Sequence, residues 1–521
     1  MSRPNPASFA AFLTAACCLV PPASVLFAQQ PSAVATSRSA WIAEGERRGV
    51  RYSGGIVPGG ATPELERLEL LPSERRGRGG SGGVPPGLLD TRVSRDVLAP
   101  DRASGAEPLT EAEPFLAVDP EDPGRMLALY QEDRFAEVGG ARALTYALTT
   151  DGGRHWREGL LPRLTAASGG TLARASDPWV AFGPGHVAYC AGLAFDDNLG
   201  SGGVYVSVST DGGETWGDPV RVHGQSGGTI DDKDAVAVDT NPRSPYFGRV
   251  YVGWDVSPND PSRPQTLVMA HSTDGGATFS SPATIFGAAG NIGIVPLVNP
   301  GGVVHAIWLH YEGVNNAEGG VLSPAWIYSS TSTDGGDSWS APVRVADVFD
   351  ALVPSSRTAD GLPAAAIDPA TGNLFVAWQD QRFTPGTDQI LLSVSADGRR
   401  GWSAPVRVSD GPDGAASFTP AVAVNDAGQV AVSYYSLRNS PNGNNLQVDE
   451  YLTVGGPRGR PFSRGRRQSF ASWDNRAAAI AGGRFFLGDY QGLAAAGRDF
   501  FPLWVGTTAG GPDVYTLAVG E

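Results

Sequence analysis

The sequence predicts an all-β protein in which antiparallel sheets of four short strands repeat around one axis, that is, a β-propeller. Two observations predict this fold class. A polar turn of eight residues, clearest as STDGGETW at residues 209–216, returns about every sixty residues. Each copy lies among four short apolar runs, and sheets that are apolar on both faces must bury those faces against neighbouring sheets.

The repeated turn joins the third and fourth strands of each unit. Its glycines tolerate a positive φ, and its aspartate can accept hydrogen bonds from nearby backbone N–H groups. Spacings of 60, 63, 60 and 63 residues separate the aspartates Asp151, Asp211, Asp274, Asp334 and Asp397. Identical positions at near-constant spacing indicate a structural role for these five carboxylates.

A pair of strands, the first and second of each unit, precedes each turn. This pair occurs seven times, which is more often than the turn with its aspartate. The first strands read PFLAVDP, PWVAFGP, AVAVDT, IGIVPLV, PAAAIDP, PAVAVND and RFFLGDY. We therefore expect seven blades, with six as the alternative. The last unit ends after its third strand, DVYTLAV, so residues 91–97, TRVSRDV, are expected to close it as the fourth. An open solenoid would need polar capping repeats, and the terminal repeats are apolar.

The N-terminal part divides into two segments. Residues 1–28 carry one arginine, an apolar run and small residues before Gln29, which predicts a signal peptide. Residues 29–108 are irregular and rich in glycine and arginine near their middle, which predicts a linker before the propeller at 109–521. The mature protein is therefore expected to be secreted or periplasmic.

Composition excludes several partners. The formal charge of -15 argues against a nucleic-acid or anionic-membrane partner. No cofactor is expected, because the six histidines show no zinc-type spacing.

An acidic run around the sole lysine, Lys233, is a candidate for calcium binding; it consists of Asp231, Asp232 and Asp234. The spacing of these residues matches no recognised calcium loop, and a solvated turn is the alternative. A monomer is expected.

The repeated turns match the Asp-box, or BNR repeat, and the chain resembles the sialidase-like family of secreted propellers from about Glu113 onward. The resemblance implies that the five turn aspartates are structural Asp-box residues. It also implies sialidase chemistry, with three arginines that hold a carboxylate, an aspartate acid and a tyrosine nucleophile activated by a glutamate. Where the family places its first arginine, this sequence reads EPFLAVDP, with Glu113.

Three arginines follow the second strands of units one, five and six. Arg134, Arg382 and Arg438 could together clamp a carboxylate of the ligand. Alternatively, each braces its own loop by pairing with an acidic neighbour such as Asp133 or Asp380.

Five residues in loops at one mouth of the channel are candidates for the acid and the nucleophile. They are Asp177, Asp380, Tyr435, Asp489 and Tyr490. The alternative for each is strand capping or turn bonding. Two functions stay open: a sialidase-like glycoside hydrolase that acts on extracellular glycans, and a non-catalytic propeller that binds a glycan, peptide or protein. Convergence of acid, nucleophile and arginines in one pocket would favour the hydrolase.

Overall fold

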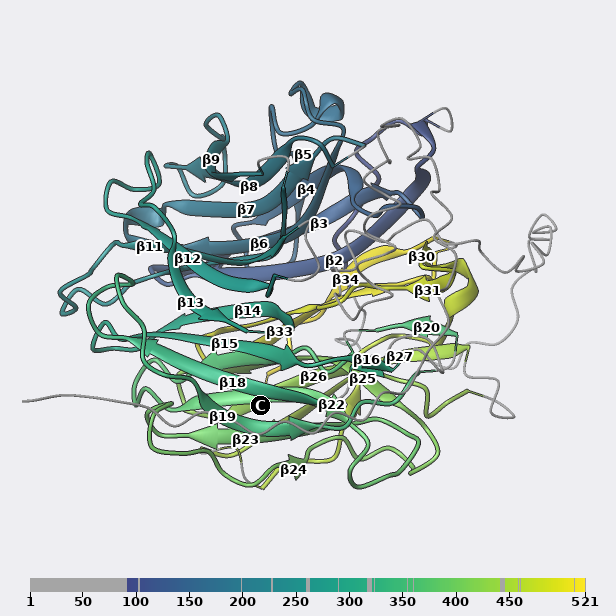
Figure 1. Ribbon diagram of the computed structural model, residues 1–521. Coiled ribbons are helices and arrows are strands. Elements are labelled where there is room, and N and C mark those ends of the chain that lie inside the picture. Colours follow the sequence, from purple (N-terminus) through teal and green to yellow (C-terminus); the bar gives the residue numbers. More distant parts are fainter. Residues whose placement is uncertain are drawn as a thin grey trace, which may run out of the picture. The chain divides into compact units, whose positions relative to one another are not determined.

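The computed structural model describes residues 91–520, with gaps at 102–103, 198, 226–227, 259–262, 289, 316–320, 323, 354, 359, 441–445, 458, 460 and 510. The predicted signal peptide and most of the predicted linker lie outside these residues. The described chain is almost entirely β-structure (Figure 1). Its helical pieces include the 3₁₀ turns η2 (Ala166–Ser168), η3 (Pro184–His186) and η6 (Asn475–Ala477). No helix in this part is long and apolar enough to cross a membrane.

The strands form successive antiparallel sets of four, which confirms the predicted all-β class and its four-stranded sheets. The first three sets are β2 (Glu107–Asp119), β3 (Asp122–Arg134), β4 (Ala141–Thr149) and β5 (Arg157–Leu160); β6 (Arg174–Phe182), β7 (Ala188–Phe195), β8 (Gly202–Ser209) and β9 (Val220–Gly224); and β10 (Thr229–Val238), β11 (Val250–Pro258), β12 (Thr266–Ser272) and β13 (Ala283–Gly287). One pairing, between Ala141 and Ala175, joins the first two sets.

The next three sets follow the same order. They are β14 (Gly290–Val298), β15 (Val304–Tyr311), β18 (Ala325–Ser332) and β19 (Val343–Val348); β21 (Ala364–Ile367), β22 (Leu374–Asp380), β23 (Gln389–Ser395) and β24 (Val406–Arg407); and β25 (Ser417–Val424), β26 (Val430–Ser436), β27 (Gln447–Gly455) and β28 (Arg466–Arg467), with β29 (Trp473–Asp474) also paired to β27. A small hairpin, β16 (Val314–Asn315) with β17 (Val321–Leu322), extends from the fourth set.

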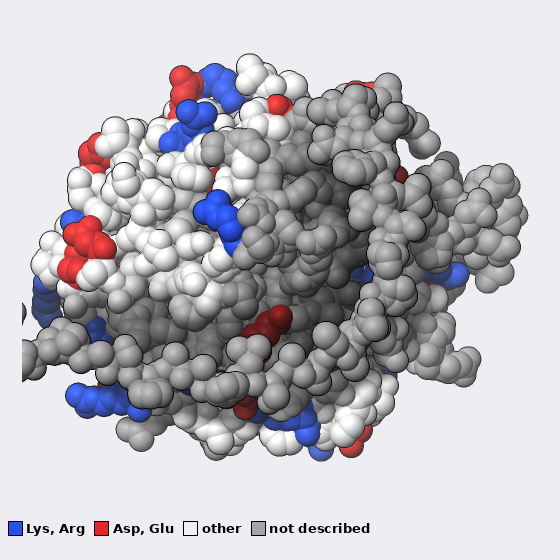
Figure 2. Space-filling model, in the orientation of Figure 1, with Lys and Arg blue, Asp and Glu red and all other residues white. Residues whose placement is uncertain are grey.

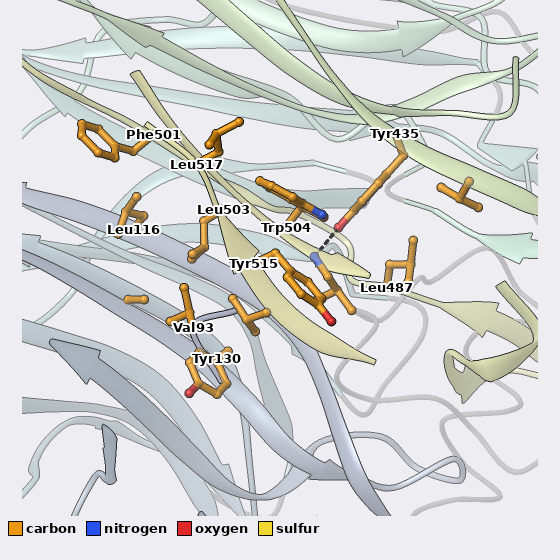
Figure 3. Close-up of a cluster of buried hydrophobic side chains, with 14 of the residues drawn as sticks. Val93, Leu116, Tyr130, Tyr435, Leu487, Phe501, Leu503, Trp504, Tyr515 and Leu517 are labelled. Carbon is orange, nitrogen blue, oxygen red and sulfur yellow. Dashed lines mark hydrogen bonds between the residues drawn. The ribbon is translucent and has the colours of Figure 1, made fainter. Parts of the chain in front are cut away.

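The last set takes one strand from the start of the described chain. It contains β32 (Gly492–Ala496), β33 (Asp499–Gly506), β34 (Asp513–Thr516) and β1 (Thr91–Arg92). Thr91 pairs with Thr516, and the Val93 N–H donates to the Val514 carbonyl at 2.7 Å. Val93 is fully buried in the adjoining apolar cluster, beside Leu503 and Tyr515 (Figure 3). The fourth strand of this sheet is thus supplied by residues far from it in sequence.

The first strands of the seven sets contact one another in sequence order. The contacts run from β2 to β6, β10, β14, β21, β25 and β32, and β32 contacts β2 again. Apolar clusters fill the spaces between neighbouring sheets, with Trp254, Trp308, Trp378 and Trp504 among the largest fully buried side chains. Burial of both sheet faces is what the repeated apolar strands require.

One strand assignment from the sequence was wrong. RFFLGDY was expected to open the last set, but Arg484–Phe486 is β31, which pairs with β30 (Ala479–Ala481) and with β20 (Ser356–Arg357). Phe486 is fully buried, and the Arg134 guanidinium carbon lies 4.3 Å from the centre of its ring. The true first strand, GLAAA, consists mainly of glycine and alanine, which are depleted in strands, so its pattern is weak.

On the face shown in Figure 2, the described Lys and Arg residues lie scattered among Asp and Glu residues.

Candidate functional site

The first strands of five sets share a β-bulge near their beginning. The pairing register shifts between Ala112 and Phe115, Ser176 and Trp179, Asp232 and Ala235, Ile292 and Val295, and Phe418 and Ala421. Within each bulge one residue has a positive φ: Glu113, Asp177, Lys233, Gly293 and Thr419. Four of these are not glycine, although that conformation costs roughly 1–3 kcal/mol. Bulges re-aim side chains, and three of these five residues, Glu113, Asp177 and Lys233, are charged.

Two of the bulge residues, Glu113 and Asp177, meet at the ammonium group of a third, Lys233, where Asp489 joins them. Its Nζ lies 3.1 Å from Asp489 Oδ2, 3.3 Å from Asp177 Oδ1 and 3.6 Å from Glu113 Oε1. All four side chains are at most 4% exposed. The sole lysine of the chain is therefore the centre of a buried cluster of three carboxyl groups from β2, β6 and the segment before β32. We call Glu113, Asp177, Lys233 and Asp489 the Lys233 cluster.

Two arginines and a glutamine surround the Lys233 cluster. Arg357 Nη2 lies 3.4 Å from Asp489 Oδ2. Gln131 donates from Nε2 to Glu113 Oε2 and to Ser176 Oγ, and its own Oε1 accepts from Arg134 Nη1 at 2.7 Å. Arg134 thus reaches the cluster through Gln131. These contacts hold the carboxyl groups in fixed orientations.

Glu113 and Lys233 differ in how the cluster shifts their pKa values. Burial raises the pKa of the Glu113 carboxyl to about 7, against the opposing effect of Lys233, and the charges of Asp177 and Asp489 raise it further. Burial lowers the pKa of Lys233, but the three carboxylates outweigh it and hold that pKa above its ordinary value. Lys233 is therefore a fixed cation, whereas Glu113 can carry or release a proton near neutral pH.

A cavity of about 70 Å³ adjoins the Lys233 cluster. It is lined from all seven first strands or the residues just before them: Phe115, Trp179, Lys233, Asp234, Ile294, Leu362, Ala421, Asp489, Tyr490 and Leu493 are among them. Phe115 and Trp179 stack with their ring centres 3.7 Å apart. The cavity therefore has an aromatic wall and one charged end.

Asp234 and Tyr490 complete the polar end of the cavity. Neither carboxylate oxygen of Asp234 has a hydrogen-bond partner among the described residues, and burial, with the charge of Asp177, raises its pKa well above the usual range. The Tyr490 hydroxyl donates to the Pro178 carbonyl at 3.2 Å, and its ring lies 4.8 Å from Lys233 Nζ. Burial also raises the pKa of Tyr490 well above 10.0.

The structure brings three of the five acid and nucleophile candidates together: Asp177, Asp489 and Tyr490. The other two lie elsewhere. Tyr435 is fully buried in the apolar cluster of the last sheets, where its hydroxyl accepts from the Val505 N–H at 2.9 Å (Figure 3). Asp380 is fully buried at the end of β22 and accepts from Trp378 Nε1 at 3.0 Å.

The three candidate arginines are each engaged within their own surroundings. Arg382 contacts both oxygens of Asp380, at 2.9 and 2.7 Å. Arg438 donates to Asp410 at 2.7 Å, and its guanidinium lies 3.7 Å over the ring of Tyr451. Arg134 donates to Gln131. The geometry therefore does not bring the three guanidinium groups to one point, and for Arg382 it matches the loop brace.

The Asp-Gly turns form hydrogen bonds of one pattern. In the second turn, Asp211 accepts from the Thr215 N–H at 2.9 Å and from its hydroxyl at 2.6 Å, while Ser209 Oγ accepts from the Gly213 N–H at 2.8 Å. Asp274 and Asp334 repeat these contacts, and Asp151 and Asp397 keep part of them. Hydrogen bonds from Thr278, then from Ser272, lower the pKa of Asp274 to about 2.

The acidic run on β10 is divided between different partners. Asp231 Oδ2 lies 2.7 Å from His223 Nδ1, and Asp232 accepts from the Lys233 N–H at 3.0 Å. Among the described residues, the group of acids close enough to share a metal ion lies elsewhere and does not include Asp231, Asp232 or Asp234.

Sequence reasoning missed Glu113, Lys233, Gln131 and Arg357 as parts of the site. A signal was present for the first two. In three repeats, the first apolar run ends at Asp119, Gly183 or Asp239. Six residues before these ends stand Glu113, Asp177 and Lys233, respectively. Aligned repeats therefore place three charged residues at one position of the first strand.

Comparison with known proteins finds distant similarity to solved structures. No family model matches the sequence, and no curated protein sequence matches it. An α-L-arabinanase of Penicillium chrysogenum, solved with arabinobiose, is 12% identical over 84% of this chain and 99% of its own, with a TM-score of 0.45. The Hadza microbial sialidase Hz136 is 14% identical over 63% of each chain, with a TM-score of 0.42. The sialidase of Trypanosoma rangeli, solved with the inhibitor DANA, is 13% identical over 63% of this chain and 53% of its own, with a TM-score of 0.42.

Proposed function

We propose that this chain is an exported, closed seven-bladed propeller with Asp-box turns that acts on extracellular glycans as a glycoside hydrolase. Support for closure comes from the seven first strands, whose contacts lead from β2 through β32 back to β2. The hydrogen bonds of the Asp-Gly turns support the Asp-box assignment. The sequence of residues 1–28 supports export.

One observation carries the hydrolase proposal: the carboxyl groups of Glu113, Asp177 and Asp489 all contact the ammonium group of Lys233. Glycoside hydrolysis commonly uses one carboxylic acid that protonates the leaving oxygen and a second carboxylate that stabilises or attacks the sugar carbon. Glu113, with a pKa of about 7, fits the acid. Asp489 lies at the cavity, 3.1 Å from the Lys233 cation, and fits the carboxylate.

This arrangement favours two-carboxylate chemistry over a tyrosine nucleophile. The Tyr490 hydroxyl donates a hydrogen bond to the Pro178 carbonyl, and the raised pKa of Tyr490 opposes formation of a phenolate. Arg382 and Arg438 are held by Asp380 and Asp410 rather than at the cavity. A substrate without a carboxylate therefore fits the cavity better than a sialoside.

The experiment is a screen of the purified protein against fluorogenic glycosides, with neutral hexosides, pentosides and a sialoside. We expect turnover of at least one neutral glycoside. Replacement of Glu113 by Gln should lower that rate by about 10²- to 10⁴-fold, the range that general acid catalysis contributes. Asp397→Asn, which alters an Asp-Gly turn, is the matched control and should retain the rate.

One observation favours the non-catalytic alternative, a propeller that binds a glycan or another extracellular ligand. The cavity holds about 70 Å³, whereas ligand pockets usually span about 300–1,000 Å³. If no glycoside is turned over, binding of immobilised glycans by the wild-type protein would establish this alternative. Loss of that binding in Trp179→Ala would place the glycan at the aromatic wall.

A further inference from the structure

Three carboxyl groups from distant parts of the chain meet where β1 closes the last sheet. Asp96 follows β1, Glu111 lies within β2, and Asp513 begins β34. One carboxylate oxygen of each lies within 4.8 Å of the corresponding oxygens of the other two. Oxygens that bind one Ca²⁺ lie about 2.3–2.6 Å from it, so they are no more than about 5 Å apart. The spacing of the three groups is therefore that of ligands around one cation.

Glu111 is the member that points to a missing ligand. Its side chain is fully buried, and neither of its carboxylate oxygens has a hydrogen-bond partner among the described residues. Its backbone is fixed, since its N–H donates to the Pro512 carbonyl at 3.2 Å. A buried carboxylate without a partner is strongly unfavourable, and a bound cation removes that penalty.

The protein itself supplies one cation next to the three carboxyl groups. Arg92 Nη2 lies 3.1 Å from Asp96 Oδ2 and also contacts Asp513 Oδ1. The Arg92 side chain is 38% exposed, so it can turn to solvent when another cation arrives. Glu132, the neighbouring buried acid, is already satisfied by the Leu98 N–H at 2.5 Å and by the Thr145 hydroxyl. One guanidinium therefore faces three carboxyl groups and leaves Glu111 without a partner.

We propose that Asp96, Glu111 and Asp513 form a calcium site that fastens the closing strand to the last sheet. The donors are all hard oxygen atoms, which suit Ca²⁺, Mg²⁺ or Mn²⁺ rather than metals that prefer nitrogen or sulfur ligands. Ca²⁺ accepts irregular, partly bidentate carboxylate shells, whereas Mg²⁺ keeps several waters in octahedral geometry. A site with a fully buried Glu111 has little room for those waters. Calcium bound there adds a link between the side chains of three segments that backbone hydrogen bonds, such as those from Val93 to Val514 and from Glu111 to Pro512, already bring together.

The site is tested with the full mature chain after removal of metals with a chelator. Titration with CaCl₂ by calorimetry should give one site, and the melting temperature should rise with calcium concentration as binding to the native state requires. Tb³⁺ is a luminescent probe for calcium sites. Because the Tyr515 hydroxyl lies 3.4 Å from Asp513 Oδ2, excitation of tyrosine should sensitise bound Tb³⁺, and Ca²⁺ should displace it.

Two variants separate a metal site from a structural carboxyl group. Glu111→Gln should weaken calcium binding by about ten-fold or more, because affinity depends on the number of charged ligands. Its melting temperature without calcium should equal or exceed that of the wild type, since Gln has nearly the shape of Glu and replaces a buried carboxyl group that has no hydrogen-bond partner among the described residues. Glu132→Gln is the matched control, as it neutralises a neighbouring buried acid and should keep the calcium response. The proposal is overturned if the wild type binds neither Ca²⁺ nor Tb³⁺ at millimolar concentration, or if Glu111→Gln keeps the full calcium response.

Discussion

Lys233 Nζ lies 3.1 Å from Asp489 Oδ2, and this contact joins the third four-stranded set to the segment that leads into the seventh. Both side chains are almost completely buried. The only ammonium side chain of the molecule thus holds together carboxyl groups from opposite ends of the sequence, at the end of a cavity lined by the first strands of all seven sets or by residues just before them.

Removal of this cation should destabilise the protein strongly. Lys233→Met leaves the buried carboxyl groups of Asp177 and Asp489 without the ammonium group that they contact, and breaking a buried ion pair on one side costs about 3–5 kcal/mol. Lys233→Arg keeps the charge and should lose less. Urea unfolding of the two variants and the wild type measures the difference. A loss below about 1 kcal/mol in Lys233→Met would show that the carboxyl groups do not depend on the ammonium.

Stability should also fall as pH rises through neutrality. The folded pKa of Glu113 is about 7, above the ordinary value of 4.5 for a glutamate, so the native state binds the proton more tightly than the unfolded chain. The contribution is fully present below pH 4.5 and is lost as pH rises to 7, by an amount on the order of 3 kcal/mol. Unfolding free energies at several pH values, for the wild type and for Glu113→Gln, measure it. The same slope in both proteins would assign it to another group.

The Asp-Gly turns should contribute to stability and not to turnover. Asp211→Ala removes the acceptor for the Thr215 N–H and hydroxyl. Because the turn is exposed, water replaces part of these bonds, and the expected loss is about 1 kcal/mol. Thermal unfolding measures this loss, and the rate on any glycoside should be unchanged in the folded variant. Normal stability with abolished turnover would mean that the turn belongs to a site.

Deletion of residues up to Asp101 should lower the melting temperature. The deletion removes β1, which pairs with Thr516 and Tyr515, and Val93, which is fully buried. It also exposes the edge of β34, and an unpaired edge favours aggregation. Differential scanning calorimetry, with light scattering to follow aggregation, tests the closure. An unchanged melting temperature would mean that the pairing adds nothing to stability.

The repeats made most of the fold predictable. An aspartate at the same place in each turn and alternating apolar runs specify where strands begin and end, because both depend on local backbone geometry. The last set was harder, since its first strand has the weak pattern GLAAA and its fourth strand is distant in sequence. RFFLGDY reads as a strand, but only Arg484–Phe486 forms one, and Phe486 packs beneath Arg134 instead of opening the last sheet.

The site was only partly predictable, for a physical reason. Asp177, Asp489 and Tyr490 were placed at a channel mouth from their loop positions. Whether a side chain points inward, however, depends on the bulge at which the pairing register shifts, and a bulge leaves little trace in composition. Lys233 therefore read as part of an acidic turn, although its positive φ directs it to three carboxyl groups.

The most direct test of the carboxylate site is the pH dependence of kcat/KM on whichever glycoside the protein turns over. With Glu113 as the acid, kcat/KM should fall above pH 7, as the carboxyl loses its proton, and Glu113→Gln should be slower by about 10²- to 10⁴-fold with that alkaline limb abolished. A wild-type alkaline limb that persists unchanged in Glu113→Gln, or a variant as fast as the wild type, would contradict the assignment of Glu113 and the Lys233 cluster as the catalytic centre.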